Sequence, residues 1–190
     1  LIIVVGAGVV LTVSMSPTKE LNVTINESPN KPVILIVIDS LMNEPLQKAI
    51  QDNKAPALSF LINNGYIEPQ VISSYPTMSL TIDSTLLTGT YANEHKIPGL
   101  IWYKEDENRM ISYGSGISEM WHNGIKNVAL DSVIRLNNEH LSKDVQTIHE
   151  QLTTRNIQSA SINGLLYRGS VEHHLHVPKL ISTANLLPTE

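Results

Sequence analysis

The sequence predicts an α/β fold in which helices alternate with a mostly parallel sheet. Residues 33–38 (VILIVI) form a continuous apolar run. Such a run is typical of a central parallel strand buried on both faces, because a half-exposed antiparallel strand would alternate. Residues 67–72 predict a second, short strand, which leads through a turn into an apolar helical pattern from Thr77 onward. Residues 157–162 predict another strand. This order of strand, turn and helix indicates an α/β domain.

Length and composition narrow the function classes. The chain has 190 residues, of which 42% are hydrophobic and 16% charged, so it can bury a core. Its net charge of −5 comes without any basic run, which argues against a nucleic-acid polymer as the main partner. Cysteine is absent. Any metal must therefore be held by oxygen and imidazole ligands, and no disulfide framework can form.

The first residues carry the signal for cellular location. Residues 1–15 are uncharged and almost wholly apolar, which predicts either the core of a signal peptide or part of a membrane anchor, cut within the segment. Residues 16–31 are rich in polar residues and predict a linker. The domain is then expected over residues 32–190. This organisation predicts an extracytoplasmic protein that is membrane-anchored or secreted.

A rival interpretation of the first residues is a dinucleotide-binding fingerprint. Gly6 and Gly8 match its G-x-G start. Leu11 stands at the third glycine position, and Pro17 interrupts the helix that should follow. The anchor or signal is therefore favoured.

Four helices are expected between and after the predicted strands. They are residues 44–51, 55–63, 125–136 and 141–156. Asn64-Gly65 provides a stop for the second of them. Ser142 and Asp144 provide an N-terminal cap and a first-turn negative charge for the last.

Residues 99–113 predict a hairpin whose polar turn is EDEN. Three aromatic residues accompany it: Trp102, Tyr103 and Tyr113. They either pack as ordinary strand aromatics or form a wall for a base or ring, and packing is the commoner outcome.

Asp39 is the first candidate site residue. It follows the predicted strand of residues 33–38. Ligands bind at the carboxyl ends of strands in open α/β sheets, so this carboxylate is well placed to hold a metal. The alternative role is a cap for the next helix.

Thr77 is the second candidate, directly after Tyr75-Pro76 and at the start of a helical pattern. Met78, Ile82 and Leu86 recur on one face of that helix, and Gly89 ends it. Thr77 is thus expected at the N-cap or in the first turn. Unpaired N–H groups and the helix dipole there favour a phosphate.

Together these stretches resemble the alkaline phosphatase superfamily, specifically its nucleotide pyrophosphatase/phosphodiesterase (type I phosphodiesterase) family. The matching segments are VILIVIDS, YPT at residues 75–77, and LLTGTYANEHKIPG. The resemblance covers about residues 32–178. It implies the N-terminal part of a three-layer core, a mostly parallel sheet with helices on both faces. It also implies that Asp39 is a metal ligand and that Thr77 is both nucleophile and metal ligand. If Thr77 were not the nucleophile, the nearby hydroxyl of Ser79 would be the next candidate.

The resemblance implies hydrolysis of phosphodiester or pyrophosphate bonds through a covalent threonine intermediate. Two divalent metal ions, of which Zn²⁺ is expected, would activate the threonine, and the substrate would be a small phosphoester or nucleotide. Ile82-Asp83 and Pro98-Gly99 depart from the family's P-N-H and oxyanion-binding asparagine. A phosphomonoesterase or sulfatase-like activity therefore stays open. A non-catalytic, membrane-tethered binding module, with Asp39 as a cap, is the alternative outside enzymes.

The remaining metal ligands of the family come from later D-H and D-x-x-x-H motifs, which do not follow Asp144 here. We expect them beyond Glu190, and we expect the chain alone to be inactive. The remaining histidines have other expected roles. His173, His174 and His176 either bind zinc or are solvated in a loop, and His95 is expected to hold its loop by hydrogen bonding.

Overall fold

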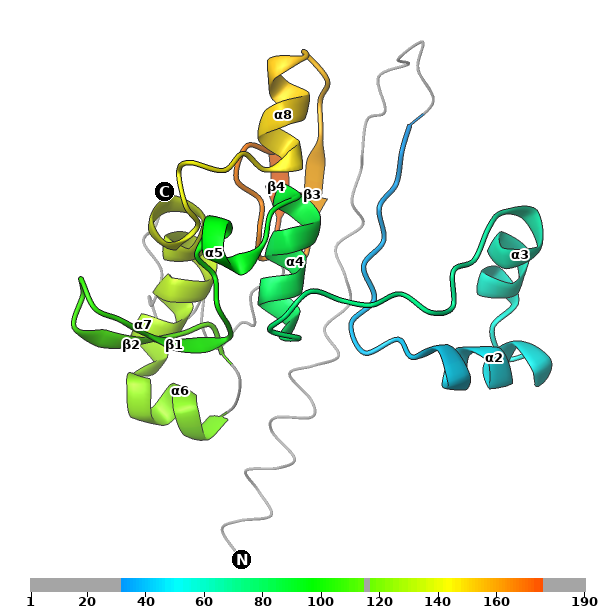
Figure 1. The fold of residues 1–190 in the computed structure, drawn as a ribbon, viewed down its shortest axis with the longest axis horizontal. Coiled ribbons are helices and arrows are strands. Elements are labelled where there is room, and N and C mark those ends of the chain that lie inside the picture. The colour runs from blue at the N-terminus through cyan, green and yellow to red at the C-terminus, as the bar shows by residue number, and fades with distance from the viewer. Residues whose placement is uncertain (1–31, 115–116, 176–190) are drawn as a thin grey trace, which may run out of the picture. The chain divides into compact units, whose positions relative to one another are not determined.

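The computed structural model describes residues 32–114 and 117–175, and these fall in two compact units. The described part of the N-terminal unit, residues 32–73, contains α2 (Asn43–Gln51) and α3 (Pro56–Asn64) (Figure 1). The C-terminal unit starts at Ser74. Its elements are α4 (Ser79–Thr88), α5 (Ala92–His95), β1 (Ile101–Lys104), β2 (Arg109–Ser112), α6 (Ile117–Asn123), α7 (Ile125–Leu130), the π-helix η1 (Asp131–His140), α8 (Ile148–Thr154), β3 (Ala160–Ile162) and β4 (Glu172–His174).

The two helices of the N-terminal unit match their predictions to within a residue at each end. Pro56 occupies the first turn of α3, where its missing N–H costs nothing and its fixed φ suits the helix. In α2, Glu44 lies in the first turn and Lys48 in the last, so both charges complement the helix dipole. Local signals were sufficient to predict both helices.

The predicted central strand, residues 33–38, is not formed. Those residues have no assigned helix or strand, and their side chains range from 94% exposed at Val33 to 48% exposed at Ile38. Residues 67–72 are likewise not a strand, and Ile72 is 95% exposed. An extended segment becomes a strand only when its N–H and C=O groups pair with a neighbour, and no strand is found among residues 32–73. The apolar pattern reports the side chains' tendency to be buried, but it supplies no partner strand.

The class, mixed helix and sheet, is as predicted, but the described residues form only two-stranded sheets. The hairpin prediction is confirmed, because β1 and β2 pair antiparallel with Ile101 opposite Ser112 and Lys104 opposite Arg109. The strand predicted at residues 157–162 is present in its last three residues as β3, which pairs parallel with β4. A three-layer parallel core is not seen in the described part of the chain.

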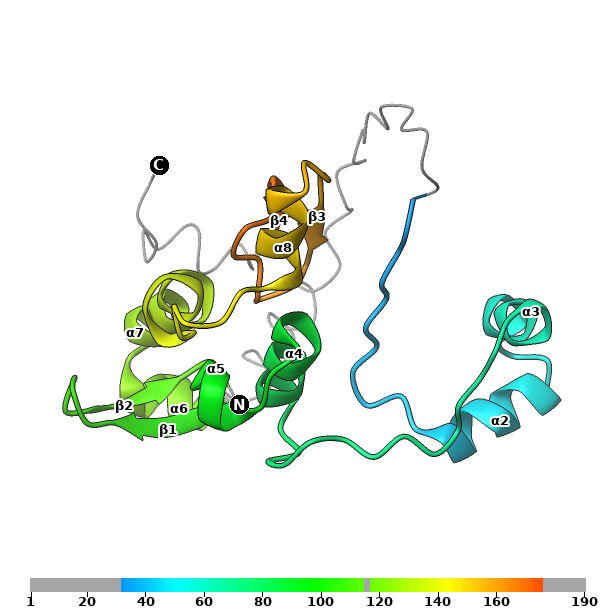
Figure 2. The same ribbon diagram turned by 45° about the horizontal axis from the view of Figure 1, so that its top comes forward.

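Each small sheet lies against helices of the C-terminal unit. Figures 1 and 2 both show β1 and β2 beside α6 and α7, and β3 and β4 beside α8. The buried apolar side chains come from α4, β2 and η1, and from the segments that follow α5, β2, η1 and β3. They include Leu80, Ile97, Ile111, Tyr113, Leu136, Leu141 and Leu166.

The buried face of α4 differs from the predicted one. Met78 and Leu86 are 40% and 56% exposed, whereas the helix buries Leu80, Thr81, Ser84 and Thr88. The Ser84 hydroxyl donates to the Leu80 carbonyl at 2.7 Å, and the Thr88 hydroxyl to that of Ser84 at 2.6 Å. Because these hydroxyls are satisfied within the helix, burying them costs little. Apolar periodicity therefore gave the wrong face. The predicted stop at Gly89 is confirmed by its left-handed φ of 70°.

The helix predicted over residues 125–136 starts as α7 and continues as a π-helix. Leu141 N–H donates to the Leu136 carbonyl, the five-residue spacing of a π-helix. Asp131, Leu136 and His140 are all buried, at spacings of five and four. The wider turn of the π-helix brings these three residues to one face. The period of an α-helix would have placed them on different faces, so the sequence pattern did not predict their common burial.

The last predicted helix, residues 141–156, forms only as α8. Its cap is Thr147, which shares a reciprocal capping box with Glu150, so the predicted cap at Ser142 is wrong. The Arg168 guanidinium donates hydrogen bonds to the carbonyls of Leu141, Ser142 and Val145 at 2.5–3.1 Å. Long-range hydrogen bonds thus hold residues 141–147 outside the helix, against their local tendency.

Residues 1–31, where the anchor or signal and the linker are predicted, lie outside the described residues. Among the helices that are described, none has both the length and the hydropathy needed to cross a membrane.

Candidate functional site

Asp39 lies in a turn of the N-terminal unit, four residues before α2. Its carboxylate accepts a hydrogen bond from the Ser40 N–H at 3.0 Å, and Ser40 has a left-handed φ of 59°. The N-cap of α2 is Met42, with no side-chain cap, so the alternative role of Asp39 as a helix cap is wrong. Asp39 is exposed.

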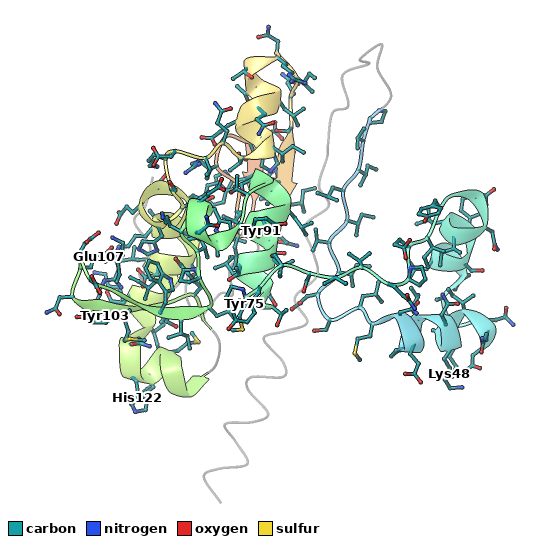
Figure 3. All side chains as sticks on the ribbon, viewed as in Figure 1. Lys48, Tyr75, Tyr91, Tyr103, Glu107 and His122 are labelled. Carbon is teal, nitrogen blue, oxygen red and sulfur yellow. The ribbon has the colours of Figure 1, made fainter. Side chains whose placement is uncertain are left out.

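Thr77 lies in the C-terminal unit, where it is exposed and precedes α4. The Met78 N–H donates to the Pro76 carbonyl at 2.9 Å and closes a tight turn centred on Thr77. The N-cap is Met78, so the predicted N-cap or first-turn position of Thr77 is corrected to the residue before the cap. The turn is what keeps Thr77 outside the helix. Tyr75, the first residue of the motif, is labelled in Figure 3.

Met78 supplies no side-chain acceptor to the first turn of α4. An N-cap serine or aspartate would accept one of the helix's first N–H groups, whereas a methionine cannot. The N-terminal end of this ten-residue helix thus has no capping oxygen of its own next to the Thr77 hydroxyl. Ser79, the next candidate nucleophile, is exposed as the first residue of α4. The arrangement suits an anionic group near Thr77.

His95 holds the segment after α4, as predicted. Its side chain is fully buried, and the Ile97 N–H donates to Nδ1 at 3.1 Å. Because Nδ1 accepts, the proton lies on Nε2, which is 3.3 Å from the Thr85 hydroxyl oxygen. The Ser74 hydroxyl in turn donates to Thr85 at 3.3 Å. These bonds connect the residue before the YPT motif with the middle of α4 and with the following loop.

Protonation of His95 is expected to destabilise the protein in mild acid. Burial lowers the pKa of its imidazole below the ordinary value of about 6.5. At a pH between the pKa of His95 in the folded protein and its ordinary value in the unfolded chain, the unfolded chain binds more protons than the folded one. The contribution of neutral, buried His95 to the unfolding free energy is therefore complete above about pH 6.5 and is lost as the pH falls below that value. Urea unfolding at several pH values between about 7 and 5 measures the slope.

His95→Gln is expected to reduce the slope of unfolding free energy against pH, because glutamine does not titrate. Buried His149 also has a pKa lowered by burial and adds a slope of the same sign. An unchanged slope in His95→Gln would show that His95 does not contribute to it.

An ion-pair network joins the hairpin to η1 and has no counterpart among the predicted sites. Arg109 holds the Asp131 carboxylate with two parallel bonds of 2.7 and 2.8 Å, and Arg135 adds a third of 2.9 Å. Burial alone would raise the pKa of Asp131, but the hydrogen bonds from both arginines outweigh it and hold this pKa below its usual range. Arg135 lies only four residues from Asp131, but Arg109 lies 22 residues away, too far for a local pattern to reveal its bond to Asp131.

The histidines of the H-H-x-H stretch do not lie in a simple loop. His173 and His174 belong to β4, and His176 lies outside the described residues. The His173 ring stacks on Tyr167 with centroids 4.0 Å apart, and His174 Nε2 is 3.9 Å from a carboxylate oxygen of Glu172. Consecutive strand residues point to opposite faces, so His173 and His174 are poorly arranged to share one ion.

The hairpin aromatics do not form a common wall. Tyr113 is buried, Trp102 packs against the core, and Tyr103 is 52% exposed. The alternation of β1 separates Trp102 from Tyr103. Ordinary packing, the commoner alternative, is what the structure shows.

Asp39 and Thr77 belong to different units, and each is described within its own unit. A comparison with known protein families finds both residues within one matched region. The family model for type I phosphodiesterase/nucleotide pyrophosphatase matches residues 33–170, which include both candidates. Searches of curated proteins and of solved structures found no match. Since the matched region covers well over half of the chain, this protein belongs to the type I phosphodiesterase/nucleotide pyrophosphatase family.

Proposed function

We propose that the protein hydrolyses phosphodiester or pyrophosphate bonds in a small, nucleotide-type substrate, with Thr77 as the nucleophile. The observation that carries the proposal is the exposed Thr77 hydroxyl in a closed turn directly before α4. A phosphoryl group beside it would lie near the helix's N-terminal N–H groups, which favour an anion. The family membership supplies the reaction class.

In the proposed reaction the Thr77 oxygen forms a bond to phosphorus as the bond to the leaving oxygen breaks. The hydroxyl proton passes to solvent, and the leaving oxygen departs with the electron pair of its bond to phosphorus. Water then attacks phosphorus as the bond to the Thr77 oxygen breaks; one proton of the water ends on that oxygen and the other passes to solvent. The turn between Pro76 and Met78 serves to hold the hydroxyl in place during both displacements.

The donor set fits a divalent metal. Asp39 offers an exposed carboxylate and Thr77 an exposed hydroxyl, and the chain has no cysteine. By the family resemblance, Asp39 and Thr77 would each contribute a ligand to a divalent ion, with Zn²⁺ expected, and the ion would lower the pKa of the nucleophilic hydroxyl and neutralise charge on the phosphoryl oxygens. The competing role of Asp39, a cap for the next helix, does not apply, because Met42 is the N-cap of α2.

Two departures from the family pattern bear on the substrate class. Ile82-Asp83 stand where the family commonly has P-N-H, and Pro98-Gly99 stand near the position of its oxyanion-binding asparagine. These differences keep a phosphomonoesterase or sulfatase-like activity as the second candidate. We further propose that the apolar residues 1–15 direct the protein out of the cytoplasm, as a cleaved signal or as an anchor.

Metal removal and Asp39→Asn test the proposal together. With bis-para-nitrophenyl phosphate as the diester, turnover by the full-length protein is expected to stop with a chelator and return with Zn²⁺. Asp39→Asn is expected to lower the rate at limiting zinc by about 100-fold or more, because it removes an anionic ligand. Asp52→Asn, a change at another acidic residue of the same unit, provides the control.

Assays with the corresponding monoester and sulfate ester test the second candidate, a phosphomonoesterase or sulfatase-like activity. Faster turnover of para-nitrophenyl phosphate or sulfate than of the diester would replace the proposed substrate class. Diester turnover that persists in the chelator would contradict the metal-dependent mechanism.

A further inference from the structure

Three side chains with metal-binding chemistry meet between the hairpin and the end of η1. Glu107 lies in the turn between β1 and β2, and Figure 3 shows it on that end of the hairpin. Glu139 and His140 are the last residues of η1. One ligand atom from each residue lies within 4.8 Å of the others. None of the three belongs to the stretches that carry Asp39 and Thr77.

The His140 ring is the best-positioned member of this cluster. Its side chain is fully buried, with Nδ1 2.9 Å from the Tyr113 hydroxyl and the Trp102 ring packed edge-on at a centroid distance of 6.0 Å. Its other nitrogen, Nε2, has no hydrogen-bond partner and lies 3.5 Å from Glu107 Oε1. A buried polar nitrogen left unpaired is costly, so this atom points to an occupant beside it.

Each carboxylate has an oxygen available. Glu107 uses Oε2 to accept from Arg109 Nε at 2.6 Å. Its Oε1 makes only longer contacts, 3.4 Å to Lys104 Nζ and 3.5 Å to His140 Nε2. The Glu139 side chain is 55% exposed, and its Oε2 lies 4.0 Å from Arg135 Nε. The Glu139 side chain can therefore turn toward the other two at little cost.

We propose that Glu107, Glu139 and His140 bind one divalent transition-metal ion, with Zn²⁺ as the best fit. Two donors on a tetrahedral zinc, each at about 2.0–2.2 Å, lie about 3.3–3.6 Å apart. The observed distance of 3.5 Å between His140 Nε2 and Glu107 Oε1 already meets this condition. Glu139 closes the site from the solvent side, and water takes the fourth position.

The chemical types of the three ligands indicate which metal the site would bind. An imidazole with two carboxylates suits Zn²⁺, whereas Mg²⁺ and Ca²⁺ prefer oxygen ligands alone. Tyr113 contributes the partner that ligating histidines usually have, because Nδ1–H can donate to its hydroxyl oxygen and leave the Nε2 lone pair for the ion. The competing occupant is a proton on Nε2, which would give a simple ion pair between His140 and Glu107.

Titration of Zn²⁺ into the purified protein distinguishes a zinc ion from a proton beside His140 Nε2. The measurement is made in the Asp39→Asn variant, so that the proposed catalytic ligand does not contribute. One ion is expected to bind, and Glu139→Gln is expected to weaken its affinity by at least about tenfold. Glu107→Gln should have a similar effect. Glu105→Gln, an exposed change in the same turn, should leave the affinity unchanged.

Nitrogen NMR of the imidazoles gives a readout that does not depend on activity. Zinc is expected to shift the Nε2 resonance of His140 in the parent and not in Glu139→Gln at the same zinc concentration. Glu139 is exposed, so its variant should remain folded, which circular dichroism checks. Zinc binding that both glutamine variants leave unchanged would place the ion elsewhere, such as at His173 and His174. That result, or no binding at millimolar zinc, would overturn the proposal.

Discussion

In the full-length protein, Thr77→Ala is expected to reduce phosphodiester turnover by about 10⁴-fold or more, because alanine lacks the attacking hydroxyl. Thr77→Ser should retain part of the rate, since serine keeps the oxygen and loses only a methyl group. The side chain is exposed, so both variants should stay within about 0.5 kcal/mol of the parent in unfolding free energy. Steady-state rates with a chromogenic diester, together with a denaturation curve for each variant, provide the measurement.

Ser79→Ala is the matched control for the nucleophile. Ser79 is exposed at the start of α4, two residues from Thr77, and is the nearest competing hydroxyl in the sequence. Its variant should keep the parental rate. If instead Thr77→Ala turned over normally and Ser79→Ala did not, the nucleophile would be Ser79.

Asp131→Asn is expected to produce the largest loss of stability, about 3 kcal/mol. The Asp131 side chain is 1% exposed and accepts hydrogen bonds from Arg109 and Arg135, each of which is 26% exposed. Asparagine keeps the shape but removes the charge, so two partly buried guanidinium groups lose the carboxylate that they share. Chemical denaturation at pH 7 measures the difference in unfolding free energy.

Asp106→Asn provides the comparison. Its carboxylate is 90% exposed and pairs with Lys104 at 3.5 Å, so solvent screens the interaction and the change should cost less than about 1 kcal/mol. Equal losses of unfolding free energy in the two variants would show that the buried network contributes no more than a surface pair.

Circular dichroism of Asp131→Asn and Asp106→Asn also tests whether the helical structure of η1 depends on its ion pair with the hairpin.

Local sequence signals were sufficient where neighbouring residues decide the structure. The helices α2 and α3, the hairpin of β1 and β2, and the glycine stop at Gly89 all follow from contacts within a few residues. His95 also bonds mainly within its own segment, at Thr85 and Ile97. The motifs around Asp39 and Thr77 indicated the family, because each needs only a short run of residues, and the match over residues 33–170 confirms it.

Only the tertiary structure decided which surfaces are buried and which distant groups meet. The apolar run of residues 33–38 stays exposed because a strand needs a partner that no pattern within it can supply. Arg168 keeps residues 141–147 out of a helix, and buried Asn137 bonds to the backbone of residues 165–168 at 2.7–3.0 Å. The Glu107, Glu139 and His140 cluster also joins separate elements. Periodicity reports preferences along one helix or strand, whereas these contacts depend on how the chain returns to itself.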